Sequence, residues 1–220
     1  MSAVDAVEEP AHLSRIQEKN RALILDAALS EFSKYGFQGA TIEKISKAAG
    51  MSKSNLLYYF SSKPAVYQAV LAHILDEWLT PLRTLDANGD PAEELSKYIM
   101  QKMKVSAEAP EASRLFANEI MQGAPRVMSV LEHELKPLFD EKSQVIQDWI
   151  DSGKIEPVDP AHLIFTIWAM TQHYADFESQ ISALTGSTLG KKAFRSDATS
   201  TIIRMVLRGI GLEPAKPNPG

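Results

Sequence analysis

The clearest pattern of apolar and polar positions in the chain lies between residues 41 and 63. Ile42 and Ile45 stand three residues apart, a spacing that places both side chains on the same side of an α-helix. Further along, Leu56 and Phe60 stand one helical turn apart, and polar residues fill the other side. The spacing predicts two short helices that each bury one side.

Thr41, Gly50 and Ser52 predict where these helices begin and end. Thr41 precedes the first helix and Ser52 the second, and both hydroxyls can accept a hydrogen bond from a backbone N–H of the first turn. Gly50 lies where the first helix must stop, because glycine tolerates the left-handed conformation of a C-terminal cap. The segment is therefore interpreted as a helix-turn-helix.

The second helix presents polar side chains on its outer side. A helix that enters a DNA major groove needs side chains that reach base edges and hydroxyls that hold phosphates. Asn55 can read an adenine edge and Lys53 a guanine edge, while Lys63 can hold a phosphate. The candidate DNA-binding residues are Thr41, Ser52, Lys53, Ser54, Asn55, Tyr58, Tyr59 and Lys63. Helical spacing alone is also typical of a plain packing unit of two helices.

The whole stretch, TIEKISKAAGMSKSNLLYYFSSK, resembles the DNA-binding domain of the TetR family of bacterial regulators. The positions in register with the recognition helix of that family are Ser52, Leu56, Tyr58, Phe60 and Lys63. The chain departs at Ser54, Leu57 and Tyr59, where the family more often has Gly, Tyr and His. The resemblance implies an all-α homodimer that binds a palindromic operator in double-stranded DNA and carries a body whose ligand loosens that binding.

The rest of the chain shows helical periodicity and no strand alternation. Pro137 predicts a kink or a break in its helix. The predicted fold class is all-α with about nine helices. Further helices are expected over about 14–35, 64–82, 91–109, 110–123, 125–152, 160–185 and 194–209.

These elements predict four parts of the chain. They are a disordered arm (1–14), a helix-turn-helix DNA-binding domain (15–63), a ligand-binding and dimerisation domain (64–212) and a flexible tail (213–220). A long helix that starts at Pro64 leaves the first domain and enters the second. It can transmit a displacement between them, or it can be an ordinary connecting helix.

Composition narrows the class of protein. The chain has 220 residues, 45% of them hydrophobic, and no cysteine, which excludes disulfides and thiolate metal sites. No apolar run approaches the roughly 18 residues of a membrane span, so a soluble cytoplasmic protein without a membrane partner is expected. The formal net charge is −5, yet residues 12–63 carry eight Lys or Arg against four Asp or Glu. A basic head suits DNA binding, although ordinary surface charge explains it almost as well.

The body offers no catalytic motif. It lacks a His-Glu-x-x-His sequence, and the glycines of 186–192 stand too close for a phosphate-binding loop. His162 and His173 could share a helical face, but a zinc site needs three or four ligands. We therefore expect no enzyme activity, metal or cofactor.

A ligand pocket is predicted on the helix that follows Pro160. Trp168, Gln172 and Asp176 recur at four-residue steps, so an indole, an amide and a carboxylate share one side of it. A glutamine amide complements a cyclic imide, and tryptophan stacks on a flat ring. The candidate ligand-binding residues are Trp78, Phe116, Trp168, Thr171, Gln172 and Asp176. Alternatively, Gln172 and Asp176 bond to neighbouring groups of the protein itself.

Apolar side chains also predict a dimer interface. They lie on the final helix and on the outer side of the helix before it, at Ile167, Met170, Tyr174 and Phe177. Two such helices from each of two chains would form a four-helix bundle.

The body extends the resemblance. The segments FANEIMQGAP, LFDEKSQVI and DPAHLIFTIWAMTQHYADF are similar to those of a TetR subgroup, the RutR-like pyrimidine-utilisation repressors. This resemblance implies a repressor released by uracil or thymine, with Trp168 and Gln172 lining the pocket. A TetR-type regulator with another effector, or a ligand-binding or scaffold protein with a non-functional head, are the alternatives.

Overall fold

The computed structural model describes residues 15–213. Every regular element in this range is helical, which confirms the predicted all-α class. The chain divides into two compact units, the first ending at Val70 and the second beginning at Leu71. The predicted arm and residues 214–220 of the predicted tail lie outside the described range.

The first unit is built on a long N-terminal helix. Its elements are α1 (Arg15–Gly39), α2 (Ile42–Ala48), α3 (Lys53–Tyr59) and the first turns of α4 (Lys63–Arg83). Regular α1 geometry breaks at Gly36, whose φ of 66° is in the left-handed region that glycine tolerates. Ile24, Ala28 and Phe32 form the buried stripe of α1. Ile45 of α2 and Leu56 of α3 are buried in the same unit, where α2 packs against both α1 and α3.

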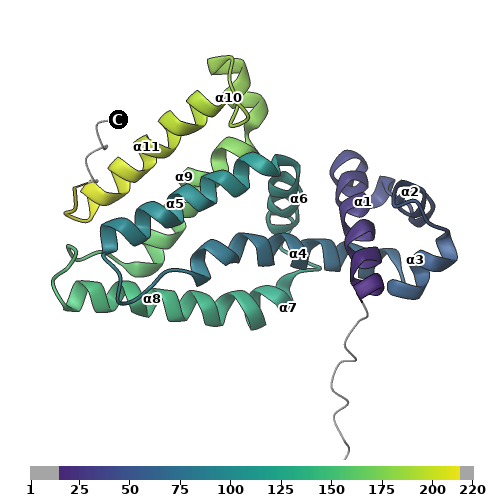
Figure 1. The fold of residues 1–220 in the computed structure, drawn as a ribbon, viewed down its shortest axis with the longest axis horizontal. Helices are drawn as coiled ribbons and strands as arrows, with labels where there is room; N and C mark the ends of the chain where they lie inside the picture. Colours follow the sequence, from purple (N-terminus) through teal and green to yellow (C-terminus); the bar gives the residue numbers. More distant parts are fainter. Residues whose placement is uncertain (1–14, 214–220) are drawn as a thin grey trace, which may run out of the picture. The chain divides into compact units, whose positions relative to one another are not determined.

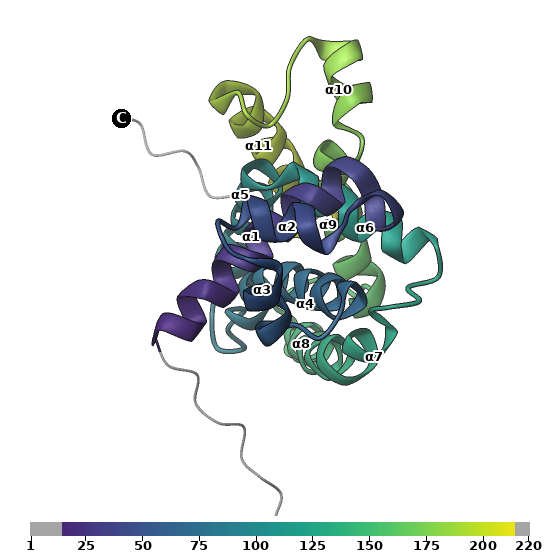
Figure 2. The same ribbon diagram turned by 90° about the vertical axis from the view of Figure 1, so that its right-hand side faces the viewer.

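The second unit contains the remainder of α4 and the rest of the described helices. In chain order these are α5 (Pro91–Glu108), α6 (Pro110–Met121), α7 (Met128–Val130), the π-helical η1 (Leu131–Leu135), α8 (Lys136–Asp151), α9 (Pro160–Asp176), α10 (Glu178–Thr185) and α11 (Lys192–Gly209). Figure 1 shows α5, α9 and α11 side by side, and the three pack against one another. Figure 2 shows that an extended segment joins α10 to α11.

Local sequence fixes where two of these helices start. Asp90 Oδ1 accepts the backbone N–H of Glu93 at 3.0 Å, and Asp159 Oδ1 accepts that of His162 at the same distance. Proline follows each aspartate at the first helical position, where it loses no hydrogen bond. Aspartate caps therefore set the starts of α5 and α9.

The helix that was predicted after Asp159 is divided into two helices in the structure. The single helix predicted from Pro160 to Thr185 ends at Asp176, and α10 begins at Glu178. The residue between them, Phe177, has φ −111° and ψ 32°, outside the helical region. Because the apolar pattern continues through Phe177, periodicity alone does not reveal this break.

The segment before Pro137 has a wider helical turn. Residues Leu131–Leu135 are π-helical, and regular α-helix resumes at Lys136. Pro137 has no N–H to donate to the carbonyl four residues earlier, so the chain around His133 cannot keep an ordinary α-helical ladder. The predicted irregularity is therefore a π-helical segment rather than a sharp break.

Ile167 does not belong to an outer face, contrary to the prediction. It is 1% exposed and lies in the core of the second unit. Phe177 and, on α11, Met205 are 52% and 56% exposed. Phe165 on α9 is 49% exposed and Leu184 on α10 is 77% exposed, so the exposed apolar side chains of this region come from α9, Phe177, α10 and α11, without Ile167.

Candidate DNA-binding surface and effector pocket

The two caps of the helix-turn-helix form as predicted. Thr41 Oγ1 accepts the N–H of Lys44 at 3.2 Å, and Ser52 Oγ accepts that of Asn55 at 3.1 Å. Gly50 has φ 69°, the left-handed conformation expected between the helices. The turn chemistry that the sequence shows is sufficient to set the start of α3.

The outer side of α3 is exposed. Lys53, Ser54 and Asn55 are exposed, and Tyr58 retains 72% of its accessible surface. Lys53 Nζ lies 2.5 Å from Glu43 Oε1 on α2. This ion pair lowers the pKa of Glu43, chiefly through the hydrogen bond from Lys53. The sequence did not indicate that the Lys53 ammonium has an acidic neighbour within the same DNA-binding unit.

Residues near the start of α1 contact the far end of α3, an arrangement that sequence reasoning missed. Three contacts are present: Gln17 Nε2 to Tyr58 Oη at 3.3 Å, Asn20 Nδ2 to Tyr59 Oη at 2.9 Å, and the Arg21 guanidinium 4.6 Å from the centre of the Phe60 ring. Spacing of three and four residues along α1 is the signal that could have placed these side chains on one side.

The structure corrects the expectation for Lys63. Its Nζ donates to the carbonyls of Phe37 at 2.8 Å and Ala40 at 3.1 Å, and lies 4.6 Å from the centre of the Phe37 ring. The ammonium therefore closes the segment that follows the break at Gly36. It is directed to backbone within the unit, and the expected phosphate contact has no support in this geometry.

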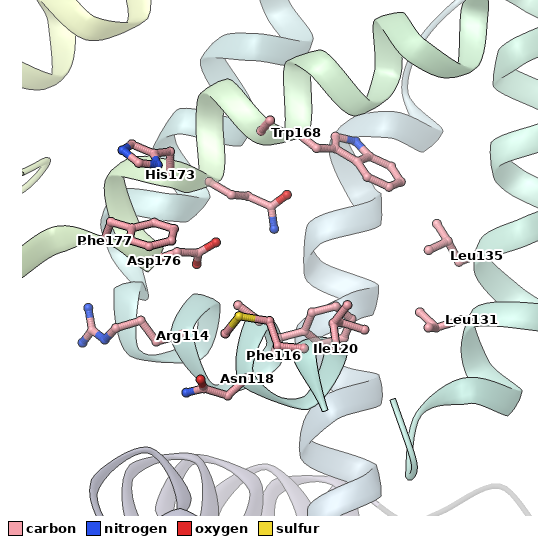
Figure 3. A pocket seen from close by; sticks show the side chains of 14 residues that line it. Arg114, Phe116, Asn118, Ile120, Leu131, Leu135, Trp168, His173, Asp176 and Phe177 are labelled. Atoms are coloured by element: carbon pink, nitrogen blue, oxygen red, sulfur yellow. The ribbon is translucent and has the colours of Figure 1, made fainter. Parts of the chain in front are cut away.

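A pocket of about 680 Å³ opens within the second unit. Its walls come from α6, η1, α9 and Phe177. Figure 3 shows Leu131 and Leu135 on the side opposite Asp176 and Phe177. The lining residues are Arg114, Phe116, Ala117, Asn118, Ile120, Met121, Leu131, Leu135, Trp168, Ala169, Gln172, His173, Asp176 and Phe177. Polar groups thus come from α6 and α9, while η1 supplies leucines.

The structure brings together four of the six candidate ligand residues. Phe116, Trp168, Gln172 and Asp176 all line this pocket. Trp78 does not line the pocket, but its ring centroid lies 5.4 Å from that of Phe116, which does. The remaining candidate is the fully buried Thr171.

Thr171 does not line the pocket and is fully buried. Its hydroxyl donates to the carbonyl of Ile167 at 2.7 Å, so it is bonded within its own helix. Its position one residue before Gln172 on the helix already indicates a different direction.

A buried polar group on α5 supports the pocket. Tyr98 Oη accepts the indole N–H of Trp168 at 2.6 Å, which fixes the edge of that ring. Burial raises the pKa of Tyr98, so the phenol stays neutral. Asp176 is the second candidate side chain with a partner inside the protein, because its Oδ1 accepts a hydrogen bond from Ser113 Oγ.

Lys102 is the most unusual residue near the pocket. It is 5% exposed, and its Nζ lies 5.2 Å from the centre of the Trp78 ring. Burial lowers the pKa of Lys102 to about 8, and the nearby Asp176 carboxylate opposes this shift. Burial raises the pKa of Asp176, against the effects of Ser113 and then of Lys102. A lysine within the apolar stripe of α5 was the signal that could have found it.

Neither metal nor membrane chemistry is evident in residues 15–213. No group of three or more His, Cys, Asp or Glu there could hold a metal ion. None of the helices within that range combines the length and apolar character of a membrane span.

The fold and the exposed α3 define a helix-turn-helix protein with a separate helical body. Residues 24–70 match the bacterial regulatory proteins of the tetR family, and residues 71–213 match the C-terminal region of YcdC-like proteins. The chain therefore belongs to the TetR family and is a DNA-binding transcriptional regulator rather than an enzyme.

Individual relatives agree with this assignment. The chain is 47% identical over 205 residues to the HTH-type transcriptional regulator RutR of Escherichia coli K12, covering 93% of this chain and 97% of RutR. It is 26% identical over 200 residues to the HTH-type transcriptional repressor NicS of Pseudomonas putida, with 88% and 93% covered. The predicted resemblance to RutR-like TetR regulators is confirmed.

A solved structure shows the same fold. The ketosteroid transcriptional regulator KstR2 of Mycobacterium tuberculosis has a TM-score of 0.67 and 19% identity, with 92% of this chain and 98% of that chain covered.

Proposed function

We propose that the protein is a dimeric repressor that leaves a palindromic operator when a small planar ligand, uracil or thymine, enters the pocket of the second unit. A regulator of this kind acts in the cytoplasm, where its DNA and its effector meet. The proposal combines the family assignment with the chemistry of the pocket.

The observation that carries the effector assignment is the shared pocket of Trp168, Gln172 and Asp176. A pyrimidinedione presents an edge on which an N–H lies beside a carbonyl, and the glutamine amide offers the complementary acceptor and donor. The Asp176 carboxylate can accept a second ring N–H. The indole of Trp168 offers a flat surface for stacking, and its bond to Tyr98 holds that surface in place. The leucines of η1 suit the apolar edge of the ring.

Dimerisation is supported by apolar surface on the second unit. Phe177 and Met205 are half-exposed, and Leu184 on α10 is 77% exposed. Exposed apolar side chains of this size are typical of protein interfaces. A two-fold dimer carries two recognition helices, which must sit about 34 Å apart to enter successive major grooves.

The coupling from pocket to DNA passes through α4 in this proposal. Phe116 lines the pocket, and its ring contacts Trp78 on α4. The same helix runs without interruption from Lys63 to Arg83, and Lys63 bonds to the carbonyls of Phe37 and Ala40 in the head. A ligand that moves Phe116 therefore acts on the helix that begins in the DNA-binding unit. A coupling free energy of about 1 to 3 kcal/mol would change operator affinity roughly 5- to 150-fold.

The test is a ligand titration on the purified full-length protein. Uracil or thymine should raise the melting temperature and release a palindromic duplex that the protein has selected from a random pool. Gln172→Ala should abolish both effects of the ligand and leave DNA affinity unchanged. Gln180→Ala, an exposed amide on α10, is the matched control and should respond like the wild type.

The outcomes separate the alternatives. If neither pyrimidine binds but another heterocycle does, the protein is a TetR-type regulator with a different effector. If a ligand binds and no selected duplex is retained at any salt concentration, the head does not function and the repressor proposal fails. If Gln172→Ala responds normally, Gln172 does not contact the ligand.

A further inference from the structure

The first turns of α1 hold the aromatic end of α3. Gln17, Asn20 and Arg21 are spaced three and four residues apart and therefore share one side of α1. They meet three consecutive residues, Tyr58, Tyr59 and Phe60. Of these contacts, the 2.9 Å bond from Asn20 Nδ2 to Tyr59 Oη has the best hydrogen-bond length, and it is partly buried.

The direction of this hydrogen bond determines what Tyr59 can do next. The amide of Asn20 donates, so the phenol oxygen is the acceptor. A phenol has one hydrogen of its own, and that hydrogen is not used in a bond that its oxygen accepts. Phosphate oxygens only accept hydrogen bonds, so a contact with the DNA backbone requires a donor. Because the Tyr59 oxygen accepts from the amide N–H, the hydroxyl hydrogen remains available to donate to a phosphate.

The ring of Tyr59 is held as well. It lies edge-on to the ring of Tyr58, with 5.2 Å between centroids and planes at 89°. Tyr59 is half-buried, whereas Tyr58 is 72% exposed. Two contacts, one to the hydroxyl and one to the ring, therefore restrict the side chain before DNA arrives. Restricting a side chain in its bound conformation reduces the entropy lost on binding.

We propose that Asn20 is a positioning residue for operator binding, which orients the Tyr59 hydroxyl so that it donates to a DNA phosphate. The inference rests on the proposed DNA-binding surface, because it requires Tyr59 to reach the backbone. Asn20 itself need not touch DNA. It acts by fixing both the place and the donor polarity of the hydroxyl.

The experiment is a double-mutant cycle on the full-length protein. The probe is the duplex that the wild type selects from a randomised pool, and the measurement is its dissociation constant by fluorescence anisotropy. The variants are Tyr59→Phe, Asn20→Ala and the pair. Ser30→Ala, an exposed polar residue on α1, is the control, and thermal unfolding of every variant reports on folding.

We expect Tyr59→Phe to weaken binding about tenfold, in keeping with a hydrogen bond to a charged group. Asn20→Ala should weaken binding about three- to tenfold when Tyr59 is present and have no effect when Phe replaces it. Removing a neutral donor releases no counterion, so the slope of affinity against salt should not change in either variant. The Ser30→Ala control should bind like the wild type.

Two results would overturn the proposal in distinguishable ways. If Tyr59→Phe binds normally, the DNA-binding surface is wrong at this residue and the positioning role falls with it. If Tyr59→Phe weakens binding but Asn20→Ala costs the same in both backgrounds, the surface stands and Asn20 has a purely structural role. Asn20→Asp is isosteric and guards against a folding defect. It accepts where Asn donates, and its negative charge repels phosphates in both backgrounds, so only the part of its loss of affinity that acts through Tyr59 should disappear when Phe replaces Tyr59.

Discussion

The burial of Lys102 predicts a measurable rise of stability with pH. Its ordinary pKa of 10.5 falls to about 8 in the folded protein because burial disfavours the charged form. Below about pH 8 the side chain is protonated in the folded and in the unfolded chain. The free energy of unfolding is then reduced by the whole cost of burying the charged ammonium. This difference in pKa corresponds to about 3 kcal/mol per subunit.

Between about pH 8 and the ordinary value, the unfolded chain binds a proton that the folded chain has released. The free energy of unfolding therefore rises with pH in this window. From about pH 7 to about pH 9.5 the expected contribution of Lys102 is about 2 kcal/mol per subunit. Burial raises the pKa of Tyr98, which opposes this trend only above the ordinary tyrosine value of 10.0.

The assay is urea unfolding, followed by tryptophan fluorescence at a fixed subunit concentration and at several pH values. The wild type should show the rise, and Lys102→Met should lack it while being at least as stable at neutral pH. Lys104→Met, which changes an exposed lysine on the same helix, should retain the rise. The reasoning is refuted if Lys102→Met keeps the full pH dependence, or if it lowers stability at neutral pH by several kcal/mol. Either result would mean that the ammonium is stabilised in place by its neighbours.

Two further changes test the pocket and the DNA-binding surface. Tyr98→Phe leaves the half-buried indole N–H of Trp168 without its acceptor, so it should cost about 1 to 3 kcal/mol of unfolding free energy and weaken ligand binding, measured by urea unfolding and calorimetry. An unchanged ligand affinity would show that the orientation of Trp168 does not matter. Lys53→Ala should weaken operator binding and reduce the slope of log affinity against log salt by about 0.9 for each phosphate that the ammonium neutralises, measured by anisotropy at several salt concentrations. An unchanged slope would exclude a phosphate contact and leave only a base contact for Lys53.

The parts of this structure that the sequence predicted are those set by neighbours along the chain. The caps at Thr41 and Ser52 depend on side chains within three residues of the N–H groups that they accept. The shared side of Trp168, Gln172 and Asp176 follows from helical geometry alone. For the same reason the helix-turn-helix and much of the pocket wall could be inferred without coordinates.

The parts that the sequence did not predict depend on distant segments. Lys63 was expected to hold a phosphate, because nothing near it in sequence shows that the carbonyls of Phe37 and Ala40 lie within reach. The break at Phe177 interrupts an apolar pattern that continues on both sides, so tertiary packing overrides the periodicity. Lys102 and Asp176 lie on different helices, and only the fold shows that they influence one another.

Polar and apolar lining residues of the pocket come from different helices, and this separation has an evolutionary consequence. Hydrogen-bonding groups are supplied by α6 and α9, whereas Leu131 and Leu135 of η1 contribute only shape. Substitution of these leucines by smaller or larger neighbours would resize the chamber and leave the polar readout intact. Regulators that descend from one ancestor could in this way bind rings with different substituents. Each would keep the same mechanism by which ligand binding changes DNA affinity.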